Sequence, residues 1–303
     1  MMNKVTVLGS LNVDTILKVQ RLPKPGETLQ IISKQNAGGG KGANQGIAAA
    51  RSNAQTSFIG KIGKDENGKM MCEVLRSAGI DITNVTTASS GTGQAFILLQ
   101  KNGENSILVY GGANQELTAA DVQKAKNKIV NSDFLVTQFE TPLECAIEGF
   151  KIAKNAGVAT ILNPAPAKKI PTELMQNVDL ITPNETEAEL LTGIKVIDEK
   201  TQCLAAEKLL EFGAKNVIIT LGSKGAFYQT KNERGFVPAL RVDAVDTTAA
   251  GDTFLGVLSS QLDKDFSNIK EAIKFANKAS ALAVQKLGAI PSIPSYKEIK
   301  RSL

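Results

Sequence analysis

Histidine is missing from the chain: none of its 303 residues is a histidine. This absence excludes Ser-His-Asp hydrolysis, papain-like Cys-His chemistry, HExxH metalloproteases and zinc held by histidine. Any acid–base catalysis must therefore use carboxylates, lysines, tyrosines or cysteines.

Cysteine is scarce as well, with only Cys72, Cys145 and Cys203. They are far apart, odd in number and form no CxxC pair, which argues against a zinc ribbon or a disulfide framework. Residues 1–19 lack the uninterrupted apolar centre of a signal peptide, because Asn12 and Asp14 break it. No apolar run reaches the length of a membrane span. We therefore expect a cytoplasmic protein.

Aromatic residues are few, at 5% of the chain, although the net charge is +5 and the pI is near 8.9. A basic protein can bind nucleic acid. Here the lysines are scattered and no aromatic stacking platform is apparent, so we expect neither nucleic acid nor a membrane as partner. A surface that attracts small anions is the better interpretation.

Strand-like and helical segments alternate along most of the chain. Strands are expected at 5–9, 56–63, 133–138, 158–166, 179–184 and 216–227. Helices are expected at 42–53, 66–78, 143–155, 185–192, 201–212, 250–263 and 268–287. This alternation predicts a doubly wound α/β fold, with a mostly parallel sheet and helices on both faces.

Two regions break the alternation and look like hairpins, 14–19 with 27–35 and 93–100 with 105–112. We expect them to form one small antiparallel sheet that stands off the main body as a lid. The alternative is an extra edge of the main sheet. Although the length also fits two domains, the organisation we predict is one domain over 1–303, with an inserted β lid formed by about 14–35 and 93–112.

A glycine-rich run, "NAGGGKGANQG" (36–46), leads into a predicted helix. It does not follow the first strand, as a dinucleotide-binding motif would, and no Walker A sequence occurs anywhere. Glycine allows a ligand to approach backbone amides closely, and Asn44 could hydrogen-bond a hydroxylated ligand. A tight turn with a helix start is the alternative.

Other polar stretches follow predicted parallel strands, where open α/β sheets bind ligands. "NVD" (12–14) suits sugar hydroxyls or a turn. "PNETE" (183–187) suits hydrated Mg²⁺ and phosphates, or a helix start. "TLGSKG" (220–225) suits a nucleotide wall or a plain turn.

"VDTTAAGDTF" (245–254) ends where a helix begins. The N–H groups at a helix start attract anions, so Ala250 and Gly251 could hold a transferring phosphoryl group. Asp252 is then either a helix cap or the base that takes a proton from an attacking hydroxyl. Phosphoryl transfer needs positioning, charge neutralisation and a base, and no histidine.

Five stretches together, "GSLNVD" (9–14), "GGKGANQ" (39–45), "TPNETE" (182–187), "TLGSKG" and "DTTAAGDTF", resemble the PfkB-type carbohydrate kinases, the ribokinase family. The resemblance covers essentially the whole chain, in order and spacing. It implies a doubly wound domain with a small β lid that also makes a homodimer contact, and it implies ATP as phosphoryl donor.

The resemblance also implies roles for individual residues. The sugar-contacting set would be Asn12, Asp14, Gly40, Lys41, Asn44, Glu140 and Asp252. The nucleotide-binding set would be Asn184, Glu187, Thr220, Gly222, Gly225, Gly251 and Asn277, with Glu187 linked to Mg²⁺. The catalytic set would be Ala250, Gly251 and Asp252. A monovalent cation, K⁺, would be held by Asp246, Thr248, Ala283, Lys286, Gly288 and Ser292.

The activity implied is ATP-dependent phosphorylation of D-ribose at its 5-hydroxyl, giving D-ribose 5-phosphate and ADP. The Ala-Ala before Gly251 favours this substrate within the family. A kinase for another sugar, a sugar phosphate or a nucleoside is the alternative, although the predicted lid has only Lys18 and Lys34 and no basic cluster for a phosphate. A non-catalytic sensor is the remote alternative, and the presence of Asp252 argues against it.

Overall fold

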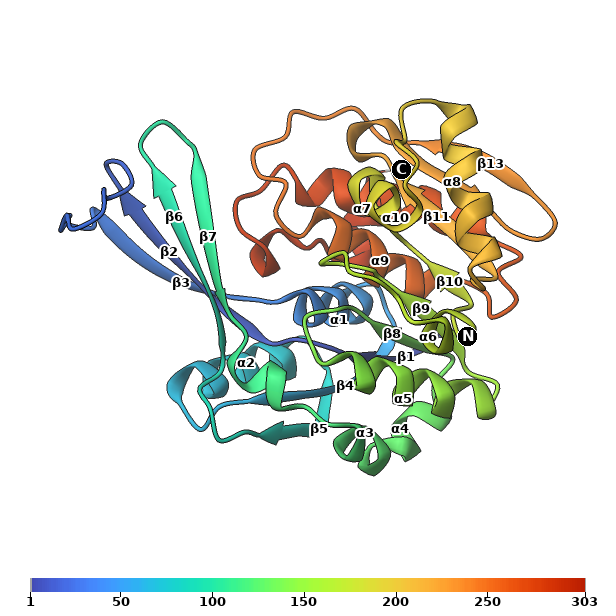
Figure 1. Ribbon diagram of the computed structural model, residues 1–303, viewed down its shortest axis with the longest axis horizontal. Coiled ribbons are helices and arrows are strands. Elements are labelled where there is room, and N and C mark those ends of the chain that lie inside the picture. Colours follow the sequence, from blue (N-terminus) through green and yellow to red (C-terminus); the bar gives the residue numbers. More distant parts are fainter. Residues whose placement is uncertain (1, 303) are drawn as a thin grey trace.

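The computed structural model describes residues 2–302. Its body is a nine-stranded sheet with helices on both faces (Figure 1). In spatial order the strands are β13 (Arg234–Pro238), β12 (Gly225–Gln229), β11 (Asn216–Thr220), β10 (Leu180–Ile181), β9 (Ala159–Leu162), β8 (Phe134–Thr137), β1 (Lys4–Leu8), β4 (Gln55–Ile62) and β5 (Asp81–Thr87). Only the β11–β12 and β12–β13 pairs are antiparallel. The predicted fold class is confirmed.

The helices divide between the two faces of this sheet. They are α1 (Lys41–Arg51), α2 (Glu66–Ser77), α3 (Ala119–Lys124), α4 (Lys126–Val130), α5 (Leu143–Asn155), α6 (Thr172–Met175), α7 (Glu185–Thr192), α8 (Glu199–Glu211), α9 (Ala250–Gln261), α10 (Ile269–Ala283) and α11 (Tyr296–Arg301). Among the residues described, none of these helices is both long and apolar enough to cross a bilayer.

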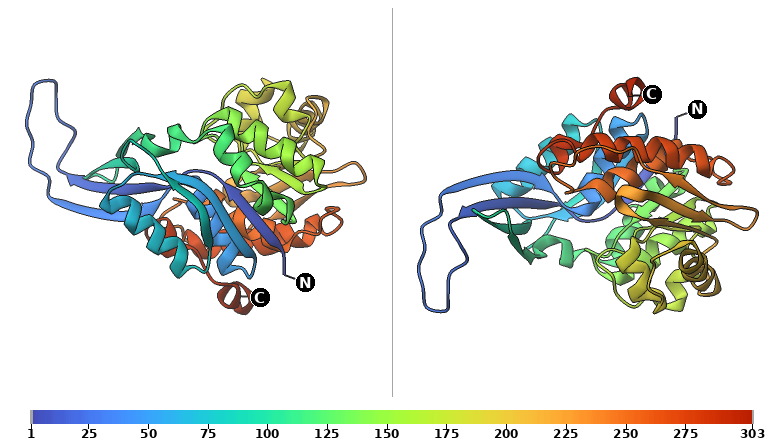
Figure 2. Two further views of the ribbon diagram at one scale, coloured as in Figure 1. Left: turned by 90° about the horizontal axis from the view of Figure 1, so that it is seen from below. Right: turned by 90° about the horizontal axis from the view of Figure 1, so that it is seen from above.

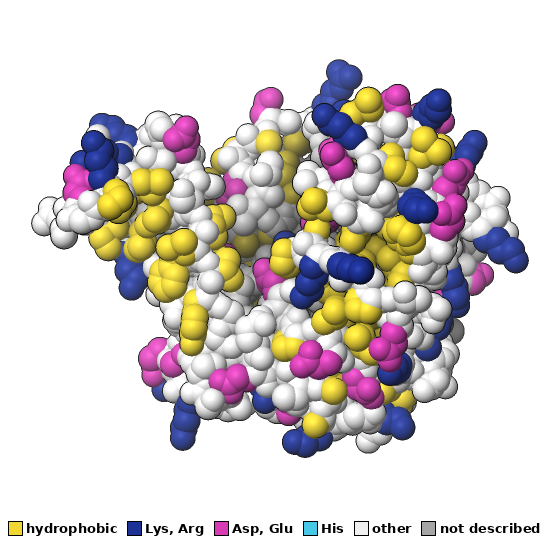
Figure 3. All heavy atoms as spheres, in the orientation of Figure 1, with side chains coloured by type: hydrophobic (Ala, Val, Ile, Leu, Met, Phe, Trp, Pro, Cys, Tyr) yellow, Lys and Arg dark blue, Asp and Glu magenta, His cyan; other side chains and the backbone are white. Residues whose placement is uncertain are grey.

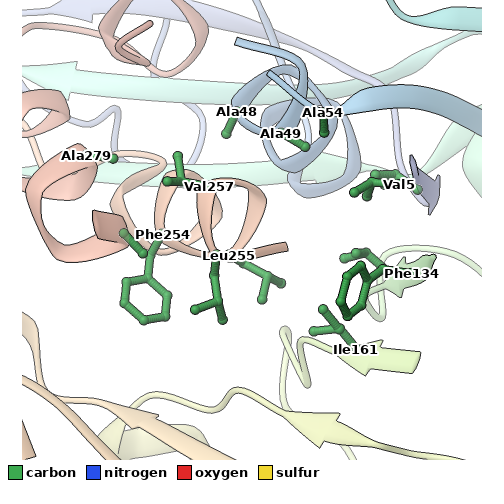
Figure 4. Close-up of a cluster of buried hydrophobic side chains, with 14 of the residues drawn as sticks. Val5, Ala48, Ala49, Ala54, Phe134, Ile161, Phe254, Leu255, Val257 and Ala279 are labelled. Carbon is green, nitrogen blue, oxygen red and sulfur yellow. The ribbon is translucent and has the colours of Figure 1, made fainter. Parts of the chain in front are cut away.

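Side chains alternate along the strands and so feed two separate cores. Val5 and Val7 of β1 face the core under α1, α2, α9 and α10, while Leu8 faces the core under α5 and α8. Figure 4 shows the first core, where Phe254, Leu255 and Val257 of α9 lie opposite strand residues such as Phe134. Helices α1 and α9 pack closely at Gly256. No other residue would fit there, because its β-carbon would lie 2.3 Å from the carbonyl oxygen of Gln45.

A second sheet of four strands projects from one side of the body (Figures 1 and 2). Its spatial order is β3 (Ser33–Gly39), β2 (Asn12–Val19), β6 (Gly93–Gln100) and β7 (Asn105–Tyr110). The sheet is separate, so the alternative of an extra edge on the main sheet was wrong.

Two details of this small sheet differ from our prediction. Its central pair, β2 and β6, is parallel rather than antiparallel. The reason is topological. Strand β2 follows β1 and β6 follows β5, and β1 and β5 run in the same direction in the main sheet. Both strands therefore enter the small sheet in the same direction. The strand expected at 27–35 begins only at Ser33, because prolines at 23 and 25 and a left-handed Gly26 (φ 81°) shape the preceding segment into a loop.

The elements of the body lie close to their predicted positions. Helices α5 and α7 have the predicted bounds, and the other five predicted helices differ at their ends by up to four residues. The short helices α3, α4, α6 and α11 were not predicted. The strand expected at 216–227 is two antiparallel strands, β11 and β12, joined by a 3₁₀ turn at Gly222–Lys224. Strands β5 and β13 were not predicted.

Candidate active site

A cavity of about 230 Å³ opens at the carboxyl ends of the parallel strands, beside the first turn of α9. Its lining residues are Lys41, Asn163, Ala165, Thr182, Asn184, Glu187, Thr220, Thr247, Ala249, Ala250, Gly251, Asp252 and Phe254. Figure 3 shows the molecule hollowed between the small sheet and the body. The sequence motifs therefore converge at the edge of the sheet where open α/β folds bind ligands.

A larger hollow of about 660 Å³ lies at the opposite, amino-terminal edge of the sheet. Two of its lysines, Lys154 and Lys215, are already paired with Asp179, at 2.6 and 3.0 Å. The smaller cavity is the better candidate because its polar groups converge on open space.

Helix α9 begins without a side-chain cap. Ala249 holds the N-cap position in the left-handed conformation (φ 59°), and no side chain caps the first-turn amides. The Ala250 amide donates to the backbone carbonyl of Thr247 at 3.2 Å. The space beside the Gly251 α-carbon is open, with no atom within 4 Å of where a β-carbon would be. An uncapped helix start facing a cavity suits an anion such as a phosphoryl group.

Asp252 lies in the first turn of α9, past the N-cap, so the cap alternative for this residue was wrong. Its carboxylate is 9% exposed and accepts two hydrogen bonds from α1. Asn44 Nδ2 donates to Oδ2 at 3.0 Å, and Gln45 Nε2 donates to Oδ1 at 2.9 Å. The carboxylate is thus held in one orientation beside the helix start.

Lys41, Glu187 and Asp252 line the cavity, and the charges of Asp14 and Glu140 act on this group from beside it. Burial, then the charges of Glu140 and Asp252, raises the pKa of Asp14 to about 6. Burial also raises the pKa of Glu187. For Lys41, burial lowers the pKa, but the surrounding charges of Asp252, Glu140 and Glu187 more than offset it, so the pKa is raised and the ammonium stays charged. Lys41 is the cation that offsets this acidic cluster.

The raised pKa of Asp14 predicts that its ionised carboxylate lowers the stability of the folded protein. Because its pKa is about 6 when folded and 3.8 when unfolded, the ionised form is disfavoured in the native state. We expect Asp14→Asn to raise the free energy of unfolding by about 1–3 kcal/mol at pH 7. The gain should shrink below pH 6 and become small near pH 4, since the folded carboxyl is then protonated and the unfolded one is partly protonated.

Urea unfolding at pH 7 and pH 4 measures this difference. Asp81→Asn is the control of opposite sign, because the hydrogen bond from Lys128, and then those from Thr83, lower the pKa of Asp81 to about 2. A loss of stability in Asp14→Asn at pH 7 would contradict the prediction.

The glycine-rich run forms the end of β3 and the start of α1, next to "NVD". A β-carbon on Gly39 would lie 2.3 Å from the Asp14 carboxylate, and Gly40 has φ 93°. Glu140 Oε2 accepts from the Lys41 amide at 3.1 Å and from Ser10 Oγ at 2.5 Å. The turn alternative is therefore correct for the backbone, and the same turn sets Asp14 and Glu140 side by side.

Asn12 and Asn44 also lie in this region. Asn12 Oδ1 accepts from Asn114 Nδ2 at 2.7 Å, and both side chains are buried. Asn44 Oδ1 is buried and has no partner. An orphaned buried acceptor beside Asp252 is free to receive a ligand hydroxyl.

The predicted nucleotide set is only partly assembled at the cavity. Asn184, Glu187, Thr220 and Gly251 line it. Asn184 and Glu187 also form a capping box, in which each side chain accepts from the other residue's amide, at 2.8 and 2.9 Å. The helix-start alternative thus holds together with the exposure to the cavity.

The remaining nucleotide candidates do not line the cavity. Asn277 Nδ2 donates to the carbonyls of Val237 and Pro238, each at 3.2 Å. Gly225 (φ 128°) leaves room for β13, since a β-carbon there would lie 2.1 Å from the Val237 oxygen. Gly222 (φ 54°) begins the 3₁₀ turn. Each of these three residues therefore has a structural role in the fold.

The predicted cation set surrounds the loop before α9. Asp246 Oδ1 accepts from the amide and hydroxyl of Thr248, and Oδ2 accepts from the Gly288 amide at 2.8 Å. Ala283 O accepts from the Lys286 amide, and Ser292 is buried in a 3₁₀ turn. The Lys286 ammonium pairs with Glu298 at 3.2 Å. An ammonium has no lone pair, so Lys286 could hold a cation only through its backbone carbonyl.

The sequence analysis gave no role to three polar residues that line the cavity, namely Asn163, Thr182 and Thr247. It also missed four polar residues behind the site, namely Ser10, Gln45, Asn114 and Gln138. Gln138 Nε2 donates to Gln45 Oε1 at 2.6 Å. Gln45 stood inside a quoted motif, next to Asn44, and Gln138 ends a predicted strand, which is the only signal the sequence offered. Asn114 lay in a segment for which we predicted no element.

Comparison with known proteins identifies the family. The profile of the pfkB family of carbohydrate kinases matches residues 2–296. The ribokinase of Staphylococcus aureus is 51% identical over 303 residues, covering 99% of this chain and 100% of the relative. The ribokinase of Haemophilus influenzae is 46% identical over 299 residues, covering 98% and 97%.

A solved structure, that of Arabidopsis thaliana ribokinase complexed with ribose and ATP, superposes with a TM-score of 0.92 at 34% identity, covering 99% of this chain and 98% of that one. The chain belongs to the pfkB family of carbohydrate kinases, and it is an ATP-dependent carbohydrate kinase by that membership.

Proposed function

We propose that this protein transfers the γ-phosphoryl group of ATP to the 5-hydroxyl of D-ribose, giving D-ribose 5-phosphate and ADP. The observation that carries the proposal is the Asp252 carboxylate, oriented by Asn44 and Gln45 beside the uncapped start of α9. Full-length relatives named ribokinase, and a similar fold solved with ribose and ATP, support the choice of substrates.

The reaction needs a base and an anion site side by side. The ribose 5-oxygen attacks the γ-phosphorus, and the bond from that phosphorus to the β–γ bridging oxygen breaks. ADP leaves with the bonding electron pair, and the hydroxyl proton passes to Asp252. The Gly251 amide, together with the Ala250 amide once it leaves the Thr247 carbonyl, would stabilise the charge on the phosphoryl oxygens. Asp14 and the free Asn44 oxygen would hold the sugar.

A divalent ion suits the nucleotide side of the cavity. One carboxylate oxygen of Glu187 accepts a hydrogen bond from the Asn184 amide, and the residue lines the cavity. A single carboxylate fits Mg²⁺, which keeps several waters and takes its other ligands from phosphates. We propose that Glu187 helps hold Mg²⁺–ATP, and the ion would neutralise phosphate charge.

A panel assay tests the proposed function. Purified protein with Mg²⁺–ATP is offered D-ribose, 2-deoxyribose, a ketohexose, a sugar phosphate and a nucleoside, and ADP release is followed. We expect the highest kcat/KM for D-ribose. Faster turnover of another substrate would indicate a different kinase of the family, and no turnover with any would favour the sensor alternative.

We propose a monovalent cation, K⁺, at the loop before α9. Asp246 ties this loop to Gly288, and the amides of residues 245 and 246 both donate to the Val284 carbonyl, so carboxylate and carbonyl oxygens converge there. An ion bound there would fix the amides that follow at α9.

Potassium should therefore raise turnover severalfold over sodium or tetramethylammonium at constant ionic strength. Steady-state rates in the three chloride salts measure the effect. Equal rates in all three would contradict the cation site.

We propose further that the small sheet is a lid and a homodimer surface. Strand register places Ile16, Ile97 and Ile107 on the face that carries Asp14, and Leu17, Phe96, Leu98 and Leu108 on the other. Leu108 and Val109 are 63% and 64% exposed, and Figure 3 shows apolar side chains gathered on this sheet. A sheet apolar on both faces has one face for the sugar site and one for a second subunit.

We expect Leu108→Asp to raise the dissociation constant of the dimer at least tenfold and to leave the affinity for ATP unchanged. Sedimentation equilibrium and ATP titration measure the two. Ile197→Asp, which charges an exposed isoleucine of the body, is the matched control. A fully active monomeric wild type at micromolar concentration would contradict the proposal.

We propose that the protein is located in the cytoplasm. This compartment supplies ATP, and its reducing conditions suit three free cysteines.

A further inference from the structure

Asp252 is the end of a buried chain of side-chain hydrogen bonds that starts at Gln138. Gln138 Nε2 donates to Gln45 Oε1 at 2.6 Å, and Gln45 Nε2 donates to Asp252 Oδ1 at 2.9 Å. Each glutamine is 1% exposed, and neither is among the residues that line the cavity. Their side-chain hydrogen bonds reach the cavity through Asp252.

The hydrogen bonds from Gln138 to Gln45 and on to Asp252 can run in one direction only. An ionised carboxylate only accepts hydrogen bonds, so Gln45 must turn its NH₂ group to Asp252 and its carbonyl to Gln138. Gln138 must then donate, which leaves its own Oε1 buried and without a partner. A β-carbon on Gly9 would lie 2.3 Å from that oxygen, so the glycine leaves room for this amide.

Rigid elements fix the spacing of the chain. Gln138 directly follows β8, Gln45 lies in α1, and Asp252 lies in the first turn of α9. Helices α1 and α9 are in close contact at Gly256. Because backbone positions are fixed at all three points, a lost hydrogen bond cannot be recovered by a small shift.

We propose that Gln138 and Gln45 are positioning residues that orient the base Asp252 for proton transfer. The inference rests on the proposed function of this site. Hydrogen bonds to both carboxylate oxygens fix the plane of the group, so its remaining lone pairs keep the directions from which one of them would take the hydroxyl proton. Proton transfer requires that alignment, whereas binding of sugar and nucleotide does not.

A double-mutant cycle tests the chain. We expect Gln45→Met to lower kcat for ribose about 10–100-fold and Gln138→Met about 5–20-fold, with KM for both substrates within about threefold. In the Gln45→Met background, Gln138→Met should have no further effect, because its only route to Asp252 is gone. Gln138→Glu should be worse than Gln138→Met, since an acceptor there turns the Gln45 carbonyl toward Asp252.

Gln261→Met is the matched control. Gln261 Nε2 donates to the Ser52 carbonyl at 3.2 Å and joins the far ends of the same two helices. Its loss should lower the thermal midpoint and leave kcat unchanged. If Gln138→Met does not fold, Gln138→Asn, which keeps an amide on a shorter arm, replaces it in the cycle.

Additive losses from Gln45→Met and Gln138→Met, or a rise in KM with unchanged kcat, would overturn the inference. So would full turnover in Gln138→Glu. An inactive wild type with ribose would instead overturn the proposed function, so the two failures are distinguishable.

Discussion

Replacing Asp252 with asparagine is expected to lower kcat by about 10²–10⁴, while the dissociation constants of ribose and ATP stay near those of the wild type. Asparagine keeps the size of the side chain but cannot accept the hydroxyl proton. Its NH₂ group must also face the NH₂ of Asn44 or Gln45, so one of the hydrogen bonds at 3.0 and 2.9 Å is lost. Single-turnover rates and calorimetric titrations separate the chemical step from binding.

Asp121→Asn is the matched control for this result. Asp121 occupies the same third helical position in α3, where it completes a capping box with Thr118. Its replacement should lower stability and leave kcat within twofold. Near-normal turnover in Asp252→Asn would show that Asp252 is not the base, and the proposed mechanism would be wrong.

The body of the fold was predictable because its signals are local. Alternating apolar strands and amphipathic helices such as α5 and α7 carry their bounds in their own residues. Strand β5, "DITNVTT", has no buried residue, and it was missed because an edge strand lacks an apolar run. The parallel pairing of β2 with β6 was missed because it depends on where β1 and β5 leave the main sheet, which no local pattern records.

The site was predictable where glycine or a charged residue marks a turn, and not where a neutral amide acts inside the protein. Gln45 and Gln138 are 93 positions apart and meet only after α1 packs over β1 and β4, next to β8. Asn277 is a further example. The resemblance implies a place near the nucleotide, which stays a prediction, and the structure adds a contact that the sequence did not reveal, with the carbonyls at the end of β13.

The second large effect is expected at Lys41. Its ammonium is the cation set against Asp252, Glu140 and Glu187, and it lines the cavity beside the start of α9. We expect Lys41→Met to lower kcat/KM for ATP by about 10²–10³. Without the ammonium, three carboxylates would face the incoming triphosphate, and nothing in the cluster would offset their repulsion of the transferring phosphoryl group.

Lys41→Arg distinguishes charge from shape. Arginine restores the positive charge on a bulkier, planar head, so it should recover part of the activity that methionine loses. Lys61→Met, which removes the partner of Asp121 at 3.0 Å on a side chain that is also mostly buried, is the control and should leave turnover unchanged. Steady-state kinetics of the three variants at low and high salt measures the effect. If the methionine and arginine variants lose equally, the lysine acts through its shape and not through its charge. If Lys41→Met turns over within twofold of the wild type, the cluster does not need its cation, and the anion site at α9 alone neutralises the phosphoryl group.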